Sequence, residues 1–126
     1  MSLANLHLER LQKKFPKAEL IQLGDGSTLI KIADFPLPEE KWDRQRTTAY
    51  FIAPVGYPMA PPDCFWTDPD LRLRTGAIPK GTGVQSPPFG QGPKLWFSWH
   101  TNSWSANRDD LLTYARIIQD RLDRGE

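Results

Sequence analysis

The sequence contains very little cysteine and histidine. Among its 126 residues, Cys64 is the single cysteine, and His7 and His100 are the two histidines. A lone cysteine cannot form an internal disulfide, so the composition favours a reducing compartment, and we expect a cytoplasmic protein. The three side chains lie far apart in the sequence and show no metal-ligand spacing. No phosphate-binding loop is present either, so we expect neither a metal nor a cofactor.

The sequence also lacks an excess of either charge and any long apolar run. Sixteen Lys and Arg stand against fifteen Asp and Glu, which gives a net charge of +1. Because no broad positive field exists to attract polyanions, we expect no nucleic-acid partner and no membrane partner. Charged residues begin early, at Glu9, and leave no apolar stretch long enough for a signal peptide or a membrane span. The length is typical of one domain, which we place over residues 1–126.

Apolar spacing predicts a helix near each end of the chain. The first helix ends before Pro16, and the residues on its apolar face are Ala4, Leu8, Leu11 and Phe15. The second helix is predicted to begin with Asn107, Asp109 and Asp110 in its first turn. Its buried stripe consists of Leu111, Ala115, Ile118 and Leu122.

Between the helices, β-prone segments alternate with turn residues. These segments are 18–23, 28–32, 47–53 and 64–67, followed by a short one at 94–99. The segment 68–93 contains ten Gly or Pro among its 26 residues, which predicts a long loop. The sequence therefore predicts an α+β fold with an N-terminal helix, a four-stranded antiparallel meander, a long loop and a C-terminal helix.

Four prolines surround one tyrosine between the third and fourth predicted strands. They are Pro54, Pro58, Pro61 and Pro62, and the tyrosine is Tyr57. Proline fixes φ and moves the preceding residue out of the helical region, so we expect a rigid extended crossover. The pattern resembles the Pro-x-x-Tyr-Pro-x-x-Pro-Pro motif of the ubiquitin-conjugating enzymes, which also lies between two strands. Trp104, followed by a serine before the last helix, is similar to the Trp-Ser pair of that family.

This resemblance implies the UBC-like fold, with the long loop at the active site, and bacterial variants of the family are the most similar. Members of the family accept a ubiquitin-like protein from an activating enzyme and transfer it to a target. We therefore expect a ubiquitin-like protein and an activating enzyme as the partners of this chain.

Two features depart from the family pattern. The family's cysteine stands shortly before the Trp-Ser pair, and residues 95–100 contain none. Strand alternation places Cys64 on one face with Trp66, so we interpret Cys64 as a buried structural thiol. The family's His-Pro-Asn element has only Asp68-Pro69-Asp70 as its counterpart. Asp70 is thus a candidate for orienting or deprotonating an incoming lysine, with a plain Asp-Pro turn as the alternative.

Ser98 and His100 form the candidate catalytic pair. Alternation directs Leu95, Phe97 and Trp99 toward the core, which leaves Ser98 and His100 together on the opposite face. A serine needs a neighbouring base at neutral pH, so we expect His100 to activate Ser98 as the nucleophile of acyl transfer. The alternative is a Ser-x-His pair on a strand without a catalytic role.

Three interpretations of function remain. In the first, the protein is a transferase that carries the ubiquitin-like protein as an oxyester on Ser98. In the second, it is an inactive variant that binds a ubiquitin-like protein or its partners as a non-enzymatic module. In the third, the natural nucleophile has been replaced by engineering. The missing cysteine fits the second and third interpretations, whereas the geometry expected for Ser98 and His100 favours the first.

Overall fold

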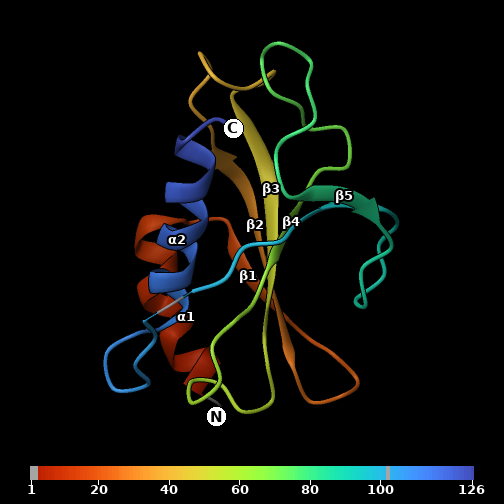
Figure 1. The fold of residues 1–126 in the computed structure, drawn as a ribbon. Helices are drawn as coiled ribbons and strands as arrows, with labels where there is room; N and C mark the ends of the chain where they lie inside the picture. The colour runs from red at the N-terminus through yellow and green to blue at the C-terminus, as the bar shows by residue number, and fades with distance from the viewer. Residues whose placement is uncertain (1–2, 102) are drawn as a thin grey trace.

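The computed structural model describes residues 3–101 and 103–126. Two helices, α1 (Leu3–Lys14) and α2 (Leu111–Asp123), lie on the same face of a β-sheet (Figure 1). The strands are β1 (Ala18–Gln22), β2 (Thr28–Pro36), β3 (Arg46–Ala53), β4 (Phe65–Thr67), β5 (Thr82–Gln85) and β6 (Lys94–Phe97). The predicted α+β fold with a helix near each end is confirmed. None of the helices in the described part of the chain has both the length and the hydrophobicity needed to cross a membrane.

The sheet contains the predicted meander and two further strands. Its order is β1-β2-β3-β4-β6-β5, and neighbouring strands are antiparallel. β5 lies within the segment 68–93, whose glycines and prolines predicted only a loop. It pairs with β6 from Thr82↔Phe97 to Gln85↔Lys94, so the hydrogen bonds that β6 offers outweigh the weak strand propensity of β5.

One hydrophobic core fills the space between the helices and the sheet. The predicted stripe of α2 is completely buried, with exposed fractions of 0% at Leu111, Ala115, Ile118 and Leu122. The core-facing side chains of β6 are buried as well, with Leu95 and Phe97 each 1% exposed. A smaller cluster on the other face of the sheet consists of Leu29, Tyr50 and Trp66, against which Phe89 of the long loop packs.

The helix α2 begins later than the acidic residues before it suggested. Asp110 is its N-cap: the Asp110 carboxylate accepts a hydrogen bond from the Thr113 backbone N–H at 3.1 Å. In return, the Asp110 backbone N–H donates to the Thr113 hydroxyl at 3.1 Å. This capping box satisfies the first free N–H groups of the helix. Asn107 and Asp109 therefore precede the helix instead of lying in its first turn.

The proline-rich segment between β3 and β4 forms turns, and the prediction of an extended crossover was wrong. The Tyr57 backbone N–H donates to the Pro54 carbonyl at 2.9 Å and closes a tight turn. The φ angle that proline fixes is compatible with such turns as well as with an extended chain. The Trp104 indole N–H donates to the Pro58 carbonyl at 2.8 Å. The two parts of the sequence motif are therefore in direct contact in the folded chain.

Candidate active site

Cys64 immediately precedes β4 and has an unusual backbone conformation. Its φ is +62°, in the left-handed region that residues other than glycine seldom adopt. Such a conformation typically costs about 1–3 kcal/mol and is concentrated at functional sites. The Cys64 N–H donates to the Trp99 carbonyl at 3.0 Å, which fixes this turn against the residues that follow β6. The residue is 8% exposed, so its predicted burial is confirmed.

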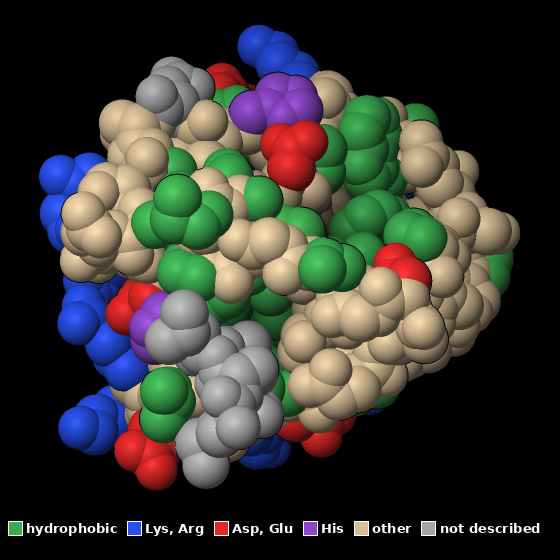
Figure 2. Space-filling model, turned by 90° about the horizontal axis from the view of Figure 1, so that it is seen from below, with side chains coloured by type: hydrophobic (Ala, Val, Ile, Leu, Met, Phe, Trp, Pro, Cys, Tyr) green, Lys and Arg blue, Asp and Glu red, His purple; other side chains and the backbone are tan. Residues whose placement is uncertain are grey.

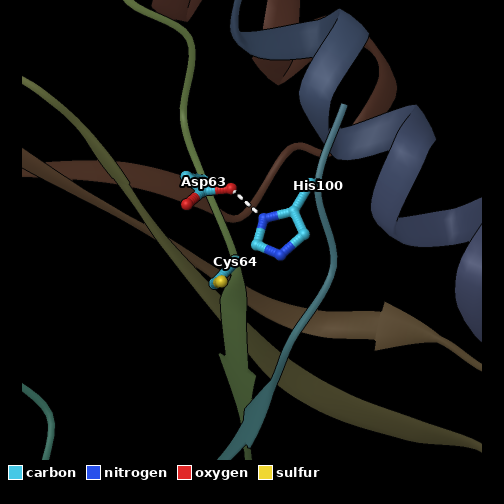
Figure 3. Close-up of side chains that lie close together, drawn as sticks. All are labelled: Asp63, Cys64 and His100. Atoms are coloured by element: carbon cyan, nitrogen blue, oxygen red, sulfur yellow. Dashed lines mark hydrogen bonds and ion pairs between the residues drawn. The ribbon is translucent and has the colours of Figure 1, made fainter. Parts of the chain in front are cut away.

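His100 and Asp63 form a pair beside Cys64 (Figure 3). The imidazole Nδ1 of His100 lies 2.5 Å from Oδ1 of Asp63. The Cys64 sulfur, the His100 ring and the Asp63 carboxylate each provide one atom, and these atoms all lie within 4.8 Å of one another. A carboxylate only accepts hydrogen bonds, so the imidazole donates from Nδ1 and keeps the lone pair of Nε2 free. The three side chains thus resemble a cysteine nucleophile with its base and an orienting acid.

The surroundings of Cys64 favour the neutral thiol. Burial raises the pKa of the Cys64 thiol, and hydrogen bonds with the Trp99 backbone and the Trp96 side chain oppose this shift. The negative charge of Asp63 raises the pKa further. Because the thiolate is the reactive form, Cys64 needs a base in order to attack a carbonyl carbon. A His100 nitrogen lies within 4.8 Å of the Cys64 sulfur, but no hydrogen bond joins these two side chains among the described residues, so His100 must move closer to accept that proton.

Tyr114 connects α2 to this site. Its side chain is 0% exposed. Its hydroxyl donates to the Cys64 carbonyl at 2.9 Å and lies 3.4 Å from the Trp99 carbonyl. The two main-chain segments that carry Cys64 and His100 are therefore held by one buried hydroxyl group.

Ser98 lies at the same end of the sheet as Cys64. Phe97 pairs with Phe65 in the antiparallel pair of β4 and β6, so Ser98, which follows Phe97, lies beside Cys64, which precedes Phe65. The side chains of Ser98 and His100 are both exposed, and both residues lie just beyond the end of β6. Across residues 3–101 and 103–126, however, no hydrogen bond joins the Ser98 hydroxyl to His100, whose ring is paired with Asp63 instead.

Asp70 lies at the opposite end of β4 from Cys64. Its carboxylate accepts a hydrogen bond from Nη1 of Arg44 at 2.9 Å, and this hydrogen bond is the main reason that the pKa of Asp70 is lowered. The structure therefore brings Asp70 to an arginine and does not bring it to Ser98 or His100.

Exposed apolar side chains lie in the segment that leads from β3 toward the site. Val55 is 71% exposed and Met59 is 81% exposed. Figure 2 views the molecule from the end at which this segment lies in Figure 1, and hydrophobic side chains gather on that face. Apolar groups concentrated on a surface are typical of sites that bind other proteins.

The fold and the contact between Trp104 and the proline-rich segment define a protein of the UBC-like class. The model of the prokaryotic E2 family E matches residues 7–125, nearly the whole chain, and the protein belongs to this family. Comparisons with curated proteins and with solved structures gave no match. Membership of the family supports a role of the ubiquitin-conjugating kind.

Sequence reasoning missed Asp63 and assigned Cys64 only a structural role. Alternation assumes that Cys64 is part of a regular strand, whereas Cys64 has a positive φ and β4 begins only at Phe65. Two signals in the sequence point to this site. Asp63 is adjacent to the single cysteine, and His100 follows the segment 94–99, which was expected to form a strand. The family's usual cysteine position falls within 95–100, and this segment is the neighbour of Cys64 in the sheet.

Proposed function

We propose that the protein carries a ubiquitin-like protein as a thioester on Cys64, accepting it from an activating enzyme and passing it to an amine. The observation that carries this proposal is the grouping of Cys64, His100 and Asp63, whose functional atoms all lie within 4.8 Å of one another. It is supported by the family match over residues 7–125. In this proposal the nucleophile lies one strand away from its usual place in the family, at the same end of the sheet.

Loading requires that the Cys64 thiol lose its proton. The free Nε2 of His100 accepts this proton, and Asp63 stabilises the imidazolium that forms. The sulfur attacks the thioester carbonyl of the activating enzyme, a new carbon–sulfur bond forms, and the enzyme's thiolate leaves and takes up the proton from His100. Discharge proceeds by the same steps: an amine attacks the carbonyl, Cys64 leaves as the thiolate, and His100 takes the proton of the amine.

Ser98 stays a second candidate nucleophile, because its exposed side chain lies at the same end of the sheet. An oxyester on Ser98 would use His100 as its base after the ring turns away from Asp63. The two nucleophiles predict different chemistry, since a thioester is cleaved by thiol reductants and an oxyester resists them but is cleaved by base.

The test is a single-turnover loading assay with ATP and the activating enzyme and ubiquitin-like protein of the same genome. We expect an adduct that is lost on adding a thiol reductant, that is absent in Cys64→Ala, and that forms at the normal rate in Ser98→Ala. His100→Ala should slow loading by about 100-fold or more, the usual contribution of a general base. A reductant-stable adduct that disappears in Ser98→Ala would transfer the role to Ser98.

The binding-module interpretation is favoured by one observation, the low exposure of Cys64 at 8%. A nucleophile must reach a carbonyl on another protein, and a buried sulfur does so only if the side chains that cover it move aside. If the wild-type protein binds the ubiquitin-like protein and forms no adduct of either kind, the protein is such a module.

Two further variants separate chemistry from docking. Met59→Asp places a charge on the exposed apolar surface, so it should weaken loading at low partner concentration without changing the stability of the fold. Asp70→Asn tests the proposed role of Asp70 toward lysine. If that role holds, this variant loads normally but transfers to lysine more slowly; if Asp70 serves only Arg44, both steps are unchanged.

A further inference from the structure

The cluster of Asp63, Cys64 and His100 also contains the ligand types that Zn²⁺ takes in proteins. Thiolate sulfur, imidazole nitrogen and carboxylate oxygen bind this ion at about 2.0–2.3 Å, which places neighbouring ligand atoms of a tetrahedral site roughly 3.3–3.8 Å apart. Here the three ligand atoms all lie within 4.8 Å of one another. Closing them around one ion requires side-chain rotations that also separate the His100 and Asp63 atoms, which now lie 2.5 Å apart.

The exposure of the three residues is suited to capture of an ion from solvent. His100 and Asp63 have side chains that are 60% and 63% exposed, so they can turn without disturbing the core. Cys64 is held at the base of the cluster by the hydrogen bond from its N–H to the Trp99 carbonyl and by the hydroxyl of Tyr114. One fixed and two adjustable ligands leave a fourth position for water, as in zinc sites with three protein ligands.

The charge of the cluster also favours a divalent cation. Within the described part of the chain, Asp63 forms an ion pair with His100 and with no Lys or Arg. A carboxylate and a thiolate together carry two negative charges, which a divalent ion neutralises. The spacing along the chain does not indicate a metal site, because Cys64 and His100 are 36 residues apart and strand pairing brings them together.

We propose that Asp63, Cys64 and His100 bind Zn²⁺, and that the bound ion prevents acyl loading. Binding replaces the proton of the Cys64 thiol by the metal and releases that proton to solvent, with no change of oxidation state. A thiolate bound to Zn²⁺ gives electron density to the ion and is therefore a weaker nucleophile than the free thiolate, and a His100 nitrogen bound to the ion is no longer free to act as a base. The metal site rests on the geometry of the cluster, whereas its inhibitory effect rests on the function proposed above.

The binding experiment uses the chelator-treated full chain, titrated with Zn²⁺ by calorimetry and with Co²⁺ by absorption spectroscopy. We expect one equivalent to bind, with a sulfur-to-cobalt charge-transfer band that is absent in Cys64→Ala. His100→Ala should abolish tight binding, and Asp63→Asn should weaken it by about 10- to 100-fold, whether Asp63 binds the ion or orients His100. Ser98→Ala is the matched control and should bind normally. No saturable binding, or binding that survives Cys64→Ala, would overturn the proposal.

The regulatory part is tested in the loading assay. Zn²⁺ added before ATP should suppress the adduct, and a chelator should restore it to the level of untreated protein. If Zn²⁺ binds through Cys64 and metal-free protein never forms an adduct, the metal site stands and the carrier function fails. If loading proceeds through Cys64 at normal rate with one equivalent of Zn²⁺ bound, the inhibitory role is refuted.

Discussion

Removal of the Tyr114 hydroxyl is the sharpest test of how the fold holds the candidate site. In Tyr114→Phe the ring remains, so its packing against Phe51, at 5.0 Å between ring centroids, is kept and no cavity forms. What is lost is the hydrogen bond of 2.9 Å to the Cys64 carbonyl and the contact of 3.4 Å to the Trp99 carbonyl. The effect therefore reports on these two contacts.

The expected cost follows from the burial of the hydroxyl. A typical net hydrogen bond contributes about 0.5–1.5 kcal/mol, and a buried acceptor left without a partner costs about 1–3 kcal/mol. We expect Tyr114→Phe to lower the free energy of unfolding by about 1–2 kcal/mol, and the melting temperature by roughly 3–8 °C for a chain of this size. Loading at Cys64 should also slow several-fold, because the turn that carries the thiol loses its anchor.

The assay is urea unfolding followed by fluorescence, with single-turnover loading on the same samples. Tyr50→Phe is the matched control, because across the described residues the Tyr50 hydroxyl makes no hydrogen bond, and it should change stability by less than about 0.5 kcal/mol. If Tyr114→Phe is as stable as the control variant and loads at the wild-type rate, the hydroxyl does not hold Cys64 in place.

Three further predictions concern the scaffold. Asp110→Ala removes the N-cap of α2 and should destabilise the fold by about 0.5–2 kcal/mol in chemical denaturation, whereas the exposed Asp120→Ala should have a negligible effect. Trp104→Phe loses the hydrogen bond to Pro58 and should cost about 1 kcal/mol by the same method; an unchanged midpoint would show that this contact does not stabilise the motif. Burial raises the pKa of Tyr57 above its ordinary value of 10.0, so stability should be complete below about pH 10 and fall as the pH rises further. The alkaline decline should be smaller in Tyr57→Phe, and an equal decline in both proteins would contradict this assignment.

The fold could be predicted from the sequence because its main elements have strong local signals. The apolar stripes of both helices, the turn residues around Asp25 and the alternation in β6 each specify an element without information from the rest of the chain. β5 could not be predicted in this way, since its four residues include a glycine and form a strand only because the edge of β6 is available.

The candidate site was only partly predictable for a related reason. Ser98 and His100 are exposed, as alternation predicted, although both residues lie beyond β6, which ends at Phe97. Alternation did not predict the conformation of Cys64. A residue with a left-handed φ interrupts a regular strand, and the hydrophobic pattern of a sequence contains no information about φ. The partner of His100 depends on the pairing of two strands far apart in sequence, and it became visible only in the folded chain.

The central claim, that Cys64 carries the acyl group, is tested most directly by locating that group on the protein. The wild-type chain is loaded with the ubiquitin-like protein, digested at low pH to preserve thioesters, and analysed by tandem mass spectrometry. We predict that the C-terminal residues of the ubiquitin-like protein are attached to the peptide containing Cys64, through a linkage that thiol reductant removes. Attachment to the peptide containing Ser98, through a linkage stable to reductant, would contradict the claim.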